Sequence, residues 1–345
     1  DLTVSSSGSV TILTLAGDDT VTVTGPALGL PADLTIDCGD GSDAIQLDTV
    51  LTLGAGSTLG AASFTAESIY LNGGSISTAR GQTYTGSVTL GTATTLTSGG
   101  QVEFAGTVEV GENSLTVTAE DVEIGGNFSG TGSVTIQGAS AGDGMQLGGS
   151  PADAPGQIEL SATEIARLAA GGNLAWLTFG RPDSTGTAAI NGFDLSGSRT
   201  NLTILAREIL DGGGAIAMGS GGLQLIASNG IGSSTDPIET SGLTDLAATT
   251  TTGGIFLRNS GSGNVNVTTV GGTSGLTTVA GGDILLANVA GAVTLSQPVT
   301  AAGNIEICAA GGDLQIHAPV SAGGNAVRLN ASAEKIGRAS CRERV

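Results

Sequence analysis

The sequence predicts an all-β protein, a parallel β-helix in which coils of about 21 residues stack on one another. Two observations predict this fold: an internal repeat of very short strands, and a composition rich in glycine and poor in aromatic residues. Glycine accounts for 59 of the 345 residues, whereas aromatic residues make up only 3%. Glycine suits corners at which φ is positive, and small β-branched side chains suit a narrow interior.

The repeat is clearest after Gly282. The segment Gly282–Leu286 is followed about 21 residues later by Gly303–Ile307, and a third copy begins at Gly324, where the apolar positions slip by one residue. The same spacing relates Val293 to Leu314. Because a unit with two or three tiny strands cannot bury a core alone, each unit is expected to form one coil and to stack on its neighbours. A chain of this length then makes roughly 16 coils.

Three parts of the chain are expected to differ in regularity. Residues 1–150 show the strand pattern with looser spacing, residues 151–200 form an elaborated junction, and residues 201–335 form regular coils. Within the junction, Ser161 and Glu164 form a capping box, which predicts one short helix near residues 161–170.

The last ten residues, 336–345, break the composition of the chain. Three arginines fall in this segment, whereas no lysine precedes Lys335. The codons ATC GGA AGA GCG TCG TGT AGG GAA AGA GTG would encode these residues, and that string resembles a sequencing adapter read through in frame. We therefore exclude residues 336–345 from the fold prediction. Since Asp1 leads directly into strand-like sequence, the chain is expected to be an internal or processed part of a longer polypeptide.

Charge and hydropathy exclude two classes of partner. Acidic residues outnumber basic residues 31 to 11, which gives a net charge of −20. A negative surface repels phosphates, so no nucleic acid partner is expected. No run of about 18 apolar residues occurs, so no insertion into a membrane is expected.

Several segments between residues 145 and 330 resemble one group of bacterial proteins. These segments are Ile158–Ile165, Leu177–Arg181, Asp183–Thr187, Gly230–Gly232, Asp236–Thr240 and Thr252–Leu257. They are similar to the filamentous haemagglutinin-like, β-strand-repeat adhesins and related S-layer-type proteins. The resemblance implies a right-handed β-helix, secretion or cell-surface display, and a structural or adhesive role. It implies host or neighbouring cell-surface glycans or proteins as partners, and it transfers no catalytic residue, so no enzyme is expected.

One motif suggests a cation. The segment Cys38–Ile45 resembles the calcium-binding nonapeptide repeat, and Gly17–Val21 is a partial second copy. In that motif, carboxylate and turn carbonyl oxygens from adjacent coils share Ca²⁺, which makes Asp19, Asp40 and Asp43 candidate ligands. The two copies are well separated in the sequence, whereas the motif usually occurs in tandem. A pair of solvated Asp-Gly turns is therefore the alternative, and a calcium-stabilised S-layer-type module is the corresponding function.

The enzymatic alternative is a polysaccharide lyase or hydrolase, since parallel β-helices also host such enzymes. These sites need clustered carboxylates beside lysine or arginine. Four aspartates cluster between residues 37 and 48, but the nearest arginine in sequence is Arg80. His317 is the single histidine, so a nucleophile-histidine pair has only one candidate base.

Overall fold

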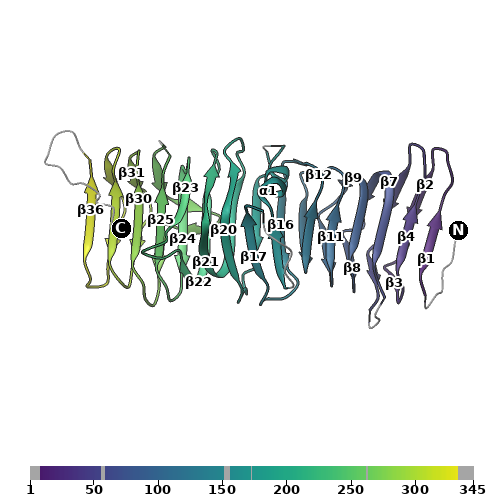
Figure 1. The fold of residues 1–345 in the computed structure, drawn as a ribbon, viewed down its shortest axis with the longest axis horizontal. Coiled ribbons are helices and arrows are strands. Elements are labelled where there is room, and N and C mark those ends of the chain that lie inside the picture. The colour runs from purple at the N-terminus through teal and green to yellow at the C-terminus, as the bar shows by residue number, and fades with distance from the viewer. Residues whose placement is uncertain (1–7, 56–58, 151–155, 172, 262, 333–345) are drawn as a thin grey trace. The chain divides into compact units, whose positions relative to one another are not determined.

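The chain is a β-solenoid of about 14 turns with about 22 residues per turn, which confirms the predicted fold class (Figure 1). It is described by a computed structural model that covers residues 8–55, 59–150, 156–171, 173–261 and 263–332. Strands account for 56% of the residues and helix for 2%. The expected 16 coils were too many because some coils carry long connections. Leu34, for example, pairs with Ala62, and Ile255 pairs with Ile284.

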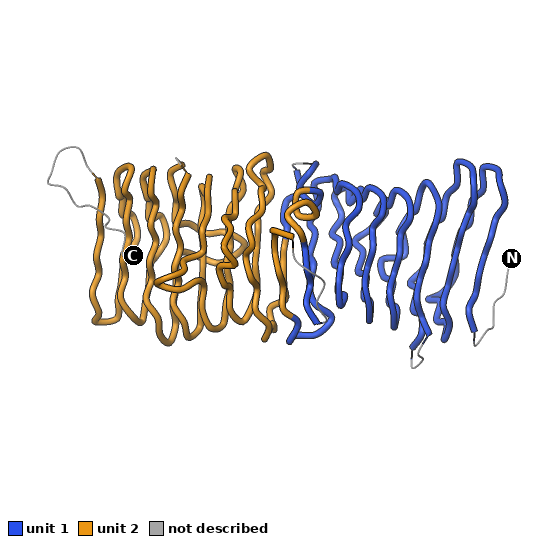
Figure 2. The backbone as a smooth tube through the Cα atoms, in the orientation of Figure 1, with its two compact units in different colours: residues 1–143, 152–160, 167–177 blue, residues 144–151, 161–166, 178–345 orange. Residues whose placement is uncertain are grey.

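Two compact units divide the chain (Figure 2). Unit 1 contains residues 1–143, 152–160 and 167–177, and unit 2 contains residues 144–151, 161–166 and 178–345. Helix α1 (Ala162–Leu168) and strand β19 (Trp176–Gly180) contribute residues to both units.

The strands of unit 1 are mostly short, although two of them have ten and nine residues, and apolar side chains face inward at alternate positions. They are β1 (Val10–Leu13), β2 (Thr20–Val23), β3 (Leu28–Leu30), β4 (Leu34–Asp37), β5 (Ala44–Leu47), β6 (Leu51–Leu53), β7 (Ala62–Leu71), β8 (Ser75–Thr78), β9 (Gln82–Leu90), β10 (Thr94–Ser98), β11 (Gln101–Phe104), β12 (Val108–Gly111), β13 (Ser114–Ala119), β14 (Asp121–Ile124), β15 (Phe128–Gly130), β16 (Ser133–Gly138) and β18 (Gln157–Leu160).

The strands of unit 2 include the longest described strand, of 18 residues. They are β17 (Gly144–Gly148), β20 (Thr187–Leu195), β21 (Asn201–Met218), β22 (Leu223–Ile231), β23 (Ile238–Ser241), β24 (Asp245–Thr250), β25 (Ile255–Asn259), β26 (Val265–Val267), β27 (Thr269–Val270), β28 (Thr273–Ser274), β29 (Leu276–Thr278), β30 (Ile284–Asn288), β31 (Val293–Leu295), β32 (Val299–Thr300), β33 (Ile305–Ala309), β34 (Leu314–Ile316), β35 (Val320–Ser321) and β36 (Val327–Ala331). Of these, β20 and β21 make a long pairing that carries one register shift.

The repeat that the sequence predicts sets the register of the last coils. Ile284 pairs with Ile305, and Val293 pairs with Leu314, all in parallel. Ile305 then pairs with Val327, which confirms the one-residue slip of the third copy.

Regular spacing also occurs in unit 1. Along one sheet, Gln82 pairs with Val102, and Val102 pairs with Val122, so the two successive steps are equal in length. Regularity is therefore not confined to residues 201–335.

Aromatic side chains form a column inside unit 1. Phe64, Tyr84, Phe104 and Phe128 come from successive coils, and their ring centroids lie 5.5, 5.3 and 5.6 Å apart. All four rings are almost completely buried. The Tyr84 hydroxyl donates to Oε1 of buried Gln82 at 2.8 Å, and burial raises the pKa of Tyr84 well above its usual value. The column thus fills the core while its one hydroxyl stays neutral and bonded.

Polar side chains form a column inside unit 2. Thr240, Asn259 and Asn288 are fully buried. Asn259 Nδ2 donates to Asn288 Oδ1 at 2.9 Å, and Asn288 Nδ2 donates to the carbonyls of Gly263 and Ala292. Thr240 Oγ1 donates to Asn259 Oδ1 at 3.2 Å. Each buried amide therefore has partners, as the low-dielectric interior requires.

The capping box predicted for the single described helix is present. Ser161 N donates to Glu164 Oε2 at 2.8 Å, and Glu164 N donates back to Ser161 Oγ at 3.2 Å. Ile165 and Leu168 are fully buried, in keeping with the predicted apolar stripe. No helix among the described residues is long and apolar enough to cross a membrane.

Candidate functional site

The acidic turns that suggested calcium stack on each other in unit 1. The turn before β2 carries Asp18 and Asp19, and the turn before β5 carries Asp40 and Asp43. They lie together because β2 pairs with β5 in parallel, with Thr20 opposite Ala44. Glu67, within β7, continues the stack because Ala44 pairs with Ser68.

Three carboxylates in this stack accept hydrogen bonds from the backbone of the adjacent coil. Asp43 Oδ1 accepts from Asp19 N at 2.8 Å, and Glu67 Oε2 accepts from Asp43 N at 2.8 Å. Asp18 Oδ1 accepts from Ser42 N at 3.0 Å. We call Asp18, Asp19, Asp43 and Glu67 the acidic ladder. Its hydrogen bonds to backbone N–H groups hold neighbouring turns together.

The structure brings two of the three predicted calcium ligands together. Asp19 and Asp43 are joined by the bond above, whereas the side chain of Asp40 is exposed and its carbonyl accepts from Gly17 N at 3.0 Å. Among the described residues, no group of three or more histidine, cysteine, aspartate or glutamate side chains could hold a metal ion. Asp43 is only 2% exposed, however, and its Oδ2 has no hydrogen-bond partner. Calcium at this ladder stays a prediction.

Cys38 lies beside the ladder, buried just after the end of β4. Burial raises the pKa of its thiol, and the carboxylates of Asp43 and Asp19 raise it further, while a contact with Thr14 partly offsets the effect. Since the thiolate is the reactive form, this cysteine is a poor nucleophile and behaves as a small apolar side chain.

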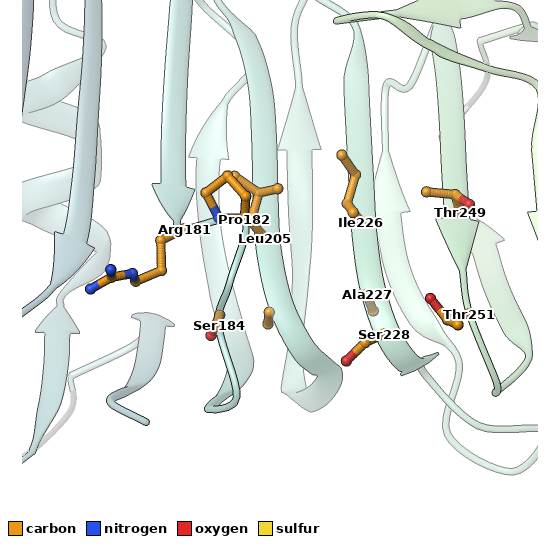
Figure 3. A pocket seen from close by; sticks show the side chains of 10 residues that line it. Arg181, Pro182, Ser184, Leu205, Ile226, Ala227, Ser228, Thr249 and Thr251 are labelled. Atoms are coloured by element: carbon orange, nitrogen blue, oxygen red, sulfur yellow. The ribbon is translucent and has the colours of Figure 1, made fainter. Parts of the chain in front are cut away.

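A hollow lies on the outer surface of unit 2 (Figure 3). It is a shallow groove of about 150 Å³. Its floor crosses the strands, because Leu205 pairs with Ile226 and Ile226 pairs with Thr249. Pro182 and Arg181 close one end, and the hydroxyls of Ser184, Ser228 and Thr251 line one side. We call this feature the Arg181 groove.

The Arg181 groove has little charge to offer a substrate. Arg181 is its only charged lining residue, and Arg181 Nε lies 2.5 Å from Asp183 Oδ1. The same arginine lowers the pKa of Asp183 through that hydrogen bond. A glycosidase needs two carboxyl groups flanking the scissile bond, and the lining contains none.

The single histidine stands apart from both features. The side chain of His317 is exposed, and its backbone N donates to the Leu295 carbonyl at 2.9 Å. Residues 336–345 lie outside the described residues.

Two parts of these sites escaped the sequence analysis. Glu67 carries a readable signal, because Asp19, Asp43 and Glu67 recur at equal intervals along the sequence. The groove carries none, because Leu205 and Ile226 look like ordinary strand residues until the register places them side by side on the outer face.

Comparisons with protein families, with curated proteins and with solved structures give no match for this chain.

Proposed function

We propose that this chain is a structural and adhesive shaft of a large bacterial surface or secreted protein, with no catalysis of its own. The observation that carries the proposal is the continuity of the coil-to-coil pairing. In the last coils, β30 pairs with β33 and β33 pairs with β36, each over five residue pairs. Such a chain of parallel pairings resists extension and leaves the outer faces free for contacts.

The surface chemistry favours adhesion over catalysis. The Arg181 groove is shallow and has no carboxylate in its lining. In the acidic ladder, the carboxylates of Asp43, Asp18 and Glu67 accept hydrogen bonds from backbone N–H groups of neighbouring turns. Under this proposal, the shaft binds cell-surface glycans or proteins through contacts that are spread over several coils.

A calcium-stabilised S-layer-type module is the second candidate. The specific observation in its favour is the buried, unpartnered Oδ2 of Asp43. A cation beside that oxygen would satisfy it, as buried polar atoms require.

Attachment and cleavage assays separate the shaft from an enzyme. Beads coated with the full chain are tested for saturable attachment to epithelial and bacterial cells, beside beads coated with serum albumin. The soluble chain is incubated with a panel of polysaccharides, and reducing ends are counted. We expect attachment above the albumin beads and no release of reducing ends. Release that grows with protein concentration and time would reject the proposal.

A further inference from the structure

One outer face of unit 1 is a two-dimensional array of hydroxyl groups. It is formed by β8, β10, β13 and β16, whose inward residues are mostly apolar and whose outward residues are serine or threonine at nearly every position. The pattern is Ser-Ile-Ser in β8, Thr-Leu-Thr in β10, Thr-Val-Thr in β13 and Thr-Ile-Gln in β16. We call this surface the hydroxyl face: Ser75, Ser77, Thr95, Thr97, Thr116, Thr118, Thr135 and Gln137.

The register aligns these side chains in two rows. In the first row, Ser75 pairs with Thr95, Thr95 with Thr116, and Thr116 with Thr135. In the second row, the pairs are Ser77 with Thr97, Thr97 with Thr118, and Thr118 with Gln137. Neighbours within a row lie about 4.8 Å apart, and the rows lie about 6.6 Å apart, because these are the strand spacing and the two-residue rise of a parallel sheet.

The hydroxyls of this face are available to bind something outside the protein. Thr95 and Thr97 are exposed, and the other members are half-buried. Among the described residues, one side-chain hydrogen bond is made within the face, from Gln137 Nε2 to Thr118 Oγ1 at 2.9 Å. By contrast, inward Thr94 and Ser98 donate to backbone carbonyls. The outward hydroxyls thus keep donor and acceptor sites for solvent or a ligand.

The hydroxyl face carries no charge, although the chain has a net charge of −20. A second sheet of the same unit carries acidic side chains instead. There, Glu103 pairs with Glu123, and Gln101 pairs with Asp121. Charge is therefore segregated between two outer faces, and the hydroxyl face presents only methyl, methylene, amide and hydroxyl groups.

We propose that the hydroxyl face binds ice. Hexagonal ice repeats its oxygen atoms at distances similar to both spacings of this array. Water held between neighbouring threonines therefore takes positions that continue into the crystal. Each such contact is weak, but the rows present many at once, and their sum anchors the protein to the ice surface.

The features of the face favour a crystal over a soluble ligand. A soluble glycan or peptide is oriented by a few convergent polar groups in a concave site. Here the polar groups are repeated, diverge from a sheet surface and include no aromatic platform. Charged groups, which hold liquid water strongly and would disrupt an ice-like layer, are absent from the described residues of this face.

The test uses the full chain and a matched pair of variants. Thr116→Lys places a bulky cation at the centre of the hydroxyl face. Thr83→Lys makes the same substitution at an outward, half-buried threonine of β9, opposite Ser63 and Glu103. Both variants change the net charge equally. The measurements are thermal hysteresis, and partition of labelled protein into a slowly growing ice hemisphere.

We expect the unmodified chain and Thr83→Lys to show thermal hysteresis and to enter the ice, and Thr116→Lys to lose both. Circular dichroism and the melting temperature confirm folding, and Thr97→Lys replaces Thr116→Lys if the latter is destabilised. Absence of both effects in the unmodified chain overturns the proposal, and so does equal activity of the two lysine variants. Co-sedimentation with microcrystalline cellulose, lost in Thr116→Lys without any ice effect, overturns it in favour of a glycan. Cell attachment above the freezing point is measured separately, so failure here leaves the shaft proposal unaffected.

Discussion

The two units build the same kind of coil around different interiors. Unit 1 stacks aromatic rings, with Tyr84 and Phe104 at 5.3 Å and nearly parallel. Unit 2 stacks buried amides, with Asn259 bonded to Asn288. The aromatic column gains stability from apolar burial and tolerates small changes of orientation, whereas the amide column requires that every donor find its acceptor. The same type of coil can therefore be filled by aromatic rings or by hydrogen-bonded amides, provided that each successive coil places a matching side chain at the same position.

The units also differ in how they treat an outer sheet face. Unit 1 leaves its hydroxyl face uncovered, whereas unit 2 places the hairpin of β27 and β28 over the outer side of β22 and β24. Gln224 Nε2 donates to the Gly271 carbonyl at 3.1 Å and to Thr273 Oγ1 at 2.7 Å, and Gln224 is only 4% exposed. A covered face is used for stability, and an uncovered face is available for binding.

The largest effect is expected from breaking the aromatic column. Phe104→Ala removes a ring that contacts Tyr84 and Phe128 and leaves a cavity, so we expect a loss of about 3–5 kcal/mol in the free energy of unfolding. Urea unfolding measures the loss, and hydrogen exchange locates it in unit 1. The control is Phe256→Ala, an outward, half-buried ring of β25 in unit 2. Equal losses in both variants would show that the column has no special role.

A smaller loss is expected from breaking the amide column of unit 2. Asn288→Ala leaves the buried Asn259 Nδ2 without its acceptor and removes the side-chain donor to the Gly263 carbonyl, while the Ala292 carbonyl keeps its bond from Val265 N. The unpartnered buried amide should cost about 2–3 kcal/mol. Urea unfolding again measures the loss. The control is Asn266→Ala, whose amide is half-buried and bonds Asp245 Oδ1. If Asn288→Ala unfolds at the same urea concentration as the control, a water molecule must replace the lost hydrogen bond to Asn259 Nδ2.

A smaller effect is expected from the response of Asp33, in unit 1, to acid. Asp33 Oδ1 accepts from Ala61 N and Gly60 N, and these bonds lower its pKa from the usual 3.8. A lowered folded-state pKa stabilises the fold above the unfolded value and loses that effect as pH falls through the folded value. Asp33→Asn should therefore melt below the unmodified chain at pH 7, and the gap should begin to narrow as the pH falls below about 3.8 and disappear once the pH is below the lowered pKa of Asp33 in the folded chain.

The matched control for the acid response is Asp313→Asn, at an exposed position of unit 2. Its melting curve should follow that of the unmodified chain at every pH. A gap between Asp33→Asn and the unmodified chain that does not narrow as the pH falls below about 3.8 would contradict the linkage to this carboxylate.

The calcium prediction concerns the acidic ladder and carries the smallest expected effect. Bound Ca²⁺ should raise the melting temperature relative to EDTA, and Asp43→Asn should abolish the rise, because a ligand that binds only the folded state stabilises it. Asp236→Asn, in an exposed turn of unit 2, should keep the rise. Identical melting in Ca²⁺ and EDTA would leave the ladder as a purely structural device.

The fold could be predicted from sequence because a coil can stack only where apolar positions recur. The repeat matches at Ile284 and Val293 therefore predicted the observed register. The number of coils was overestimated because insertions leave little trace in the local pattern. One insertion, the hairpin of β27 and β28, is marked in the sequence by the pair Gly271-Gly272. In the structure both glycines have positive φ, 57° and 87°, as a two-residue hairpin turn requires.

The sites were less predictable. A carboxylate motif can be read locally, so Asp19 and Asp43 were found together, but exposure of Asp40 depends on how its turn packs. The hydroxyl face depends on register between four strands. Its members become neighbours only once Thr95 is known to lie opposite Thr116 and Thr116 opposite Thr135.

The equal steps in unit 1 have a genetic consequence. Gln82, Val102 and Val122 occupy the same place in three successive coils, at equal intervals along the chain. Recombination between two misaligned copies of the gene at such positions would delete or duplicate one whole coil and keep the reading frame. The two coils brought together by the recombination would pair in the same register as before, because each coil contacts only the coils on either side of it. The number of coils in the protein could therefore change one at a time during evolution, and the apolar core would stay continuous after each change.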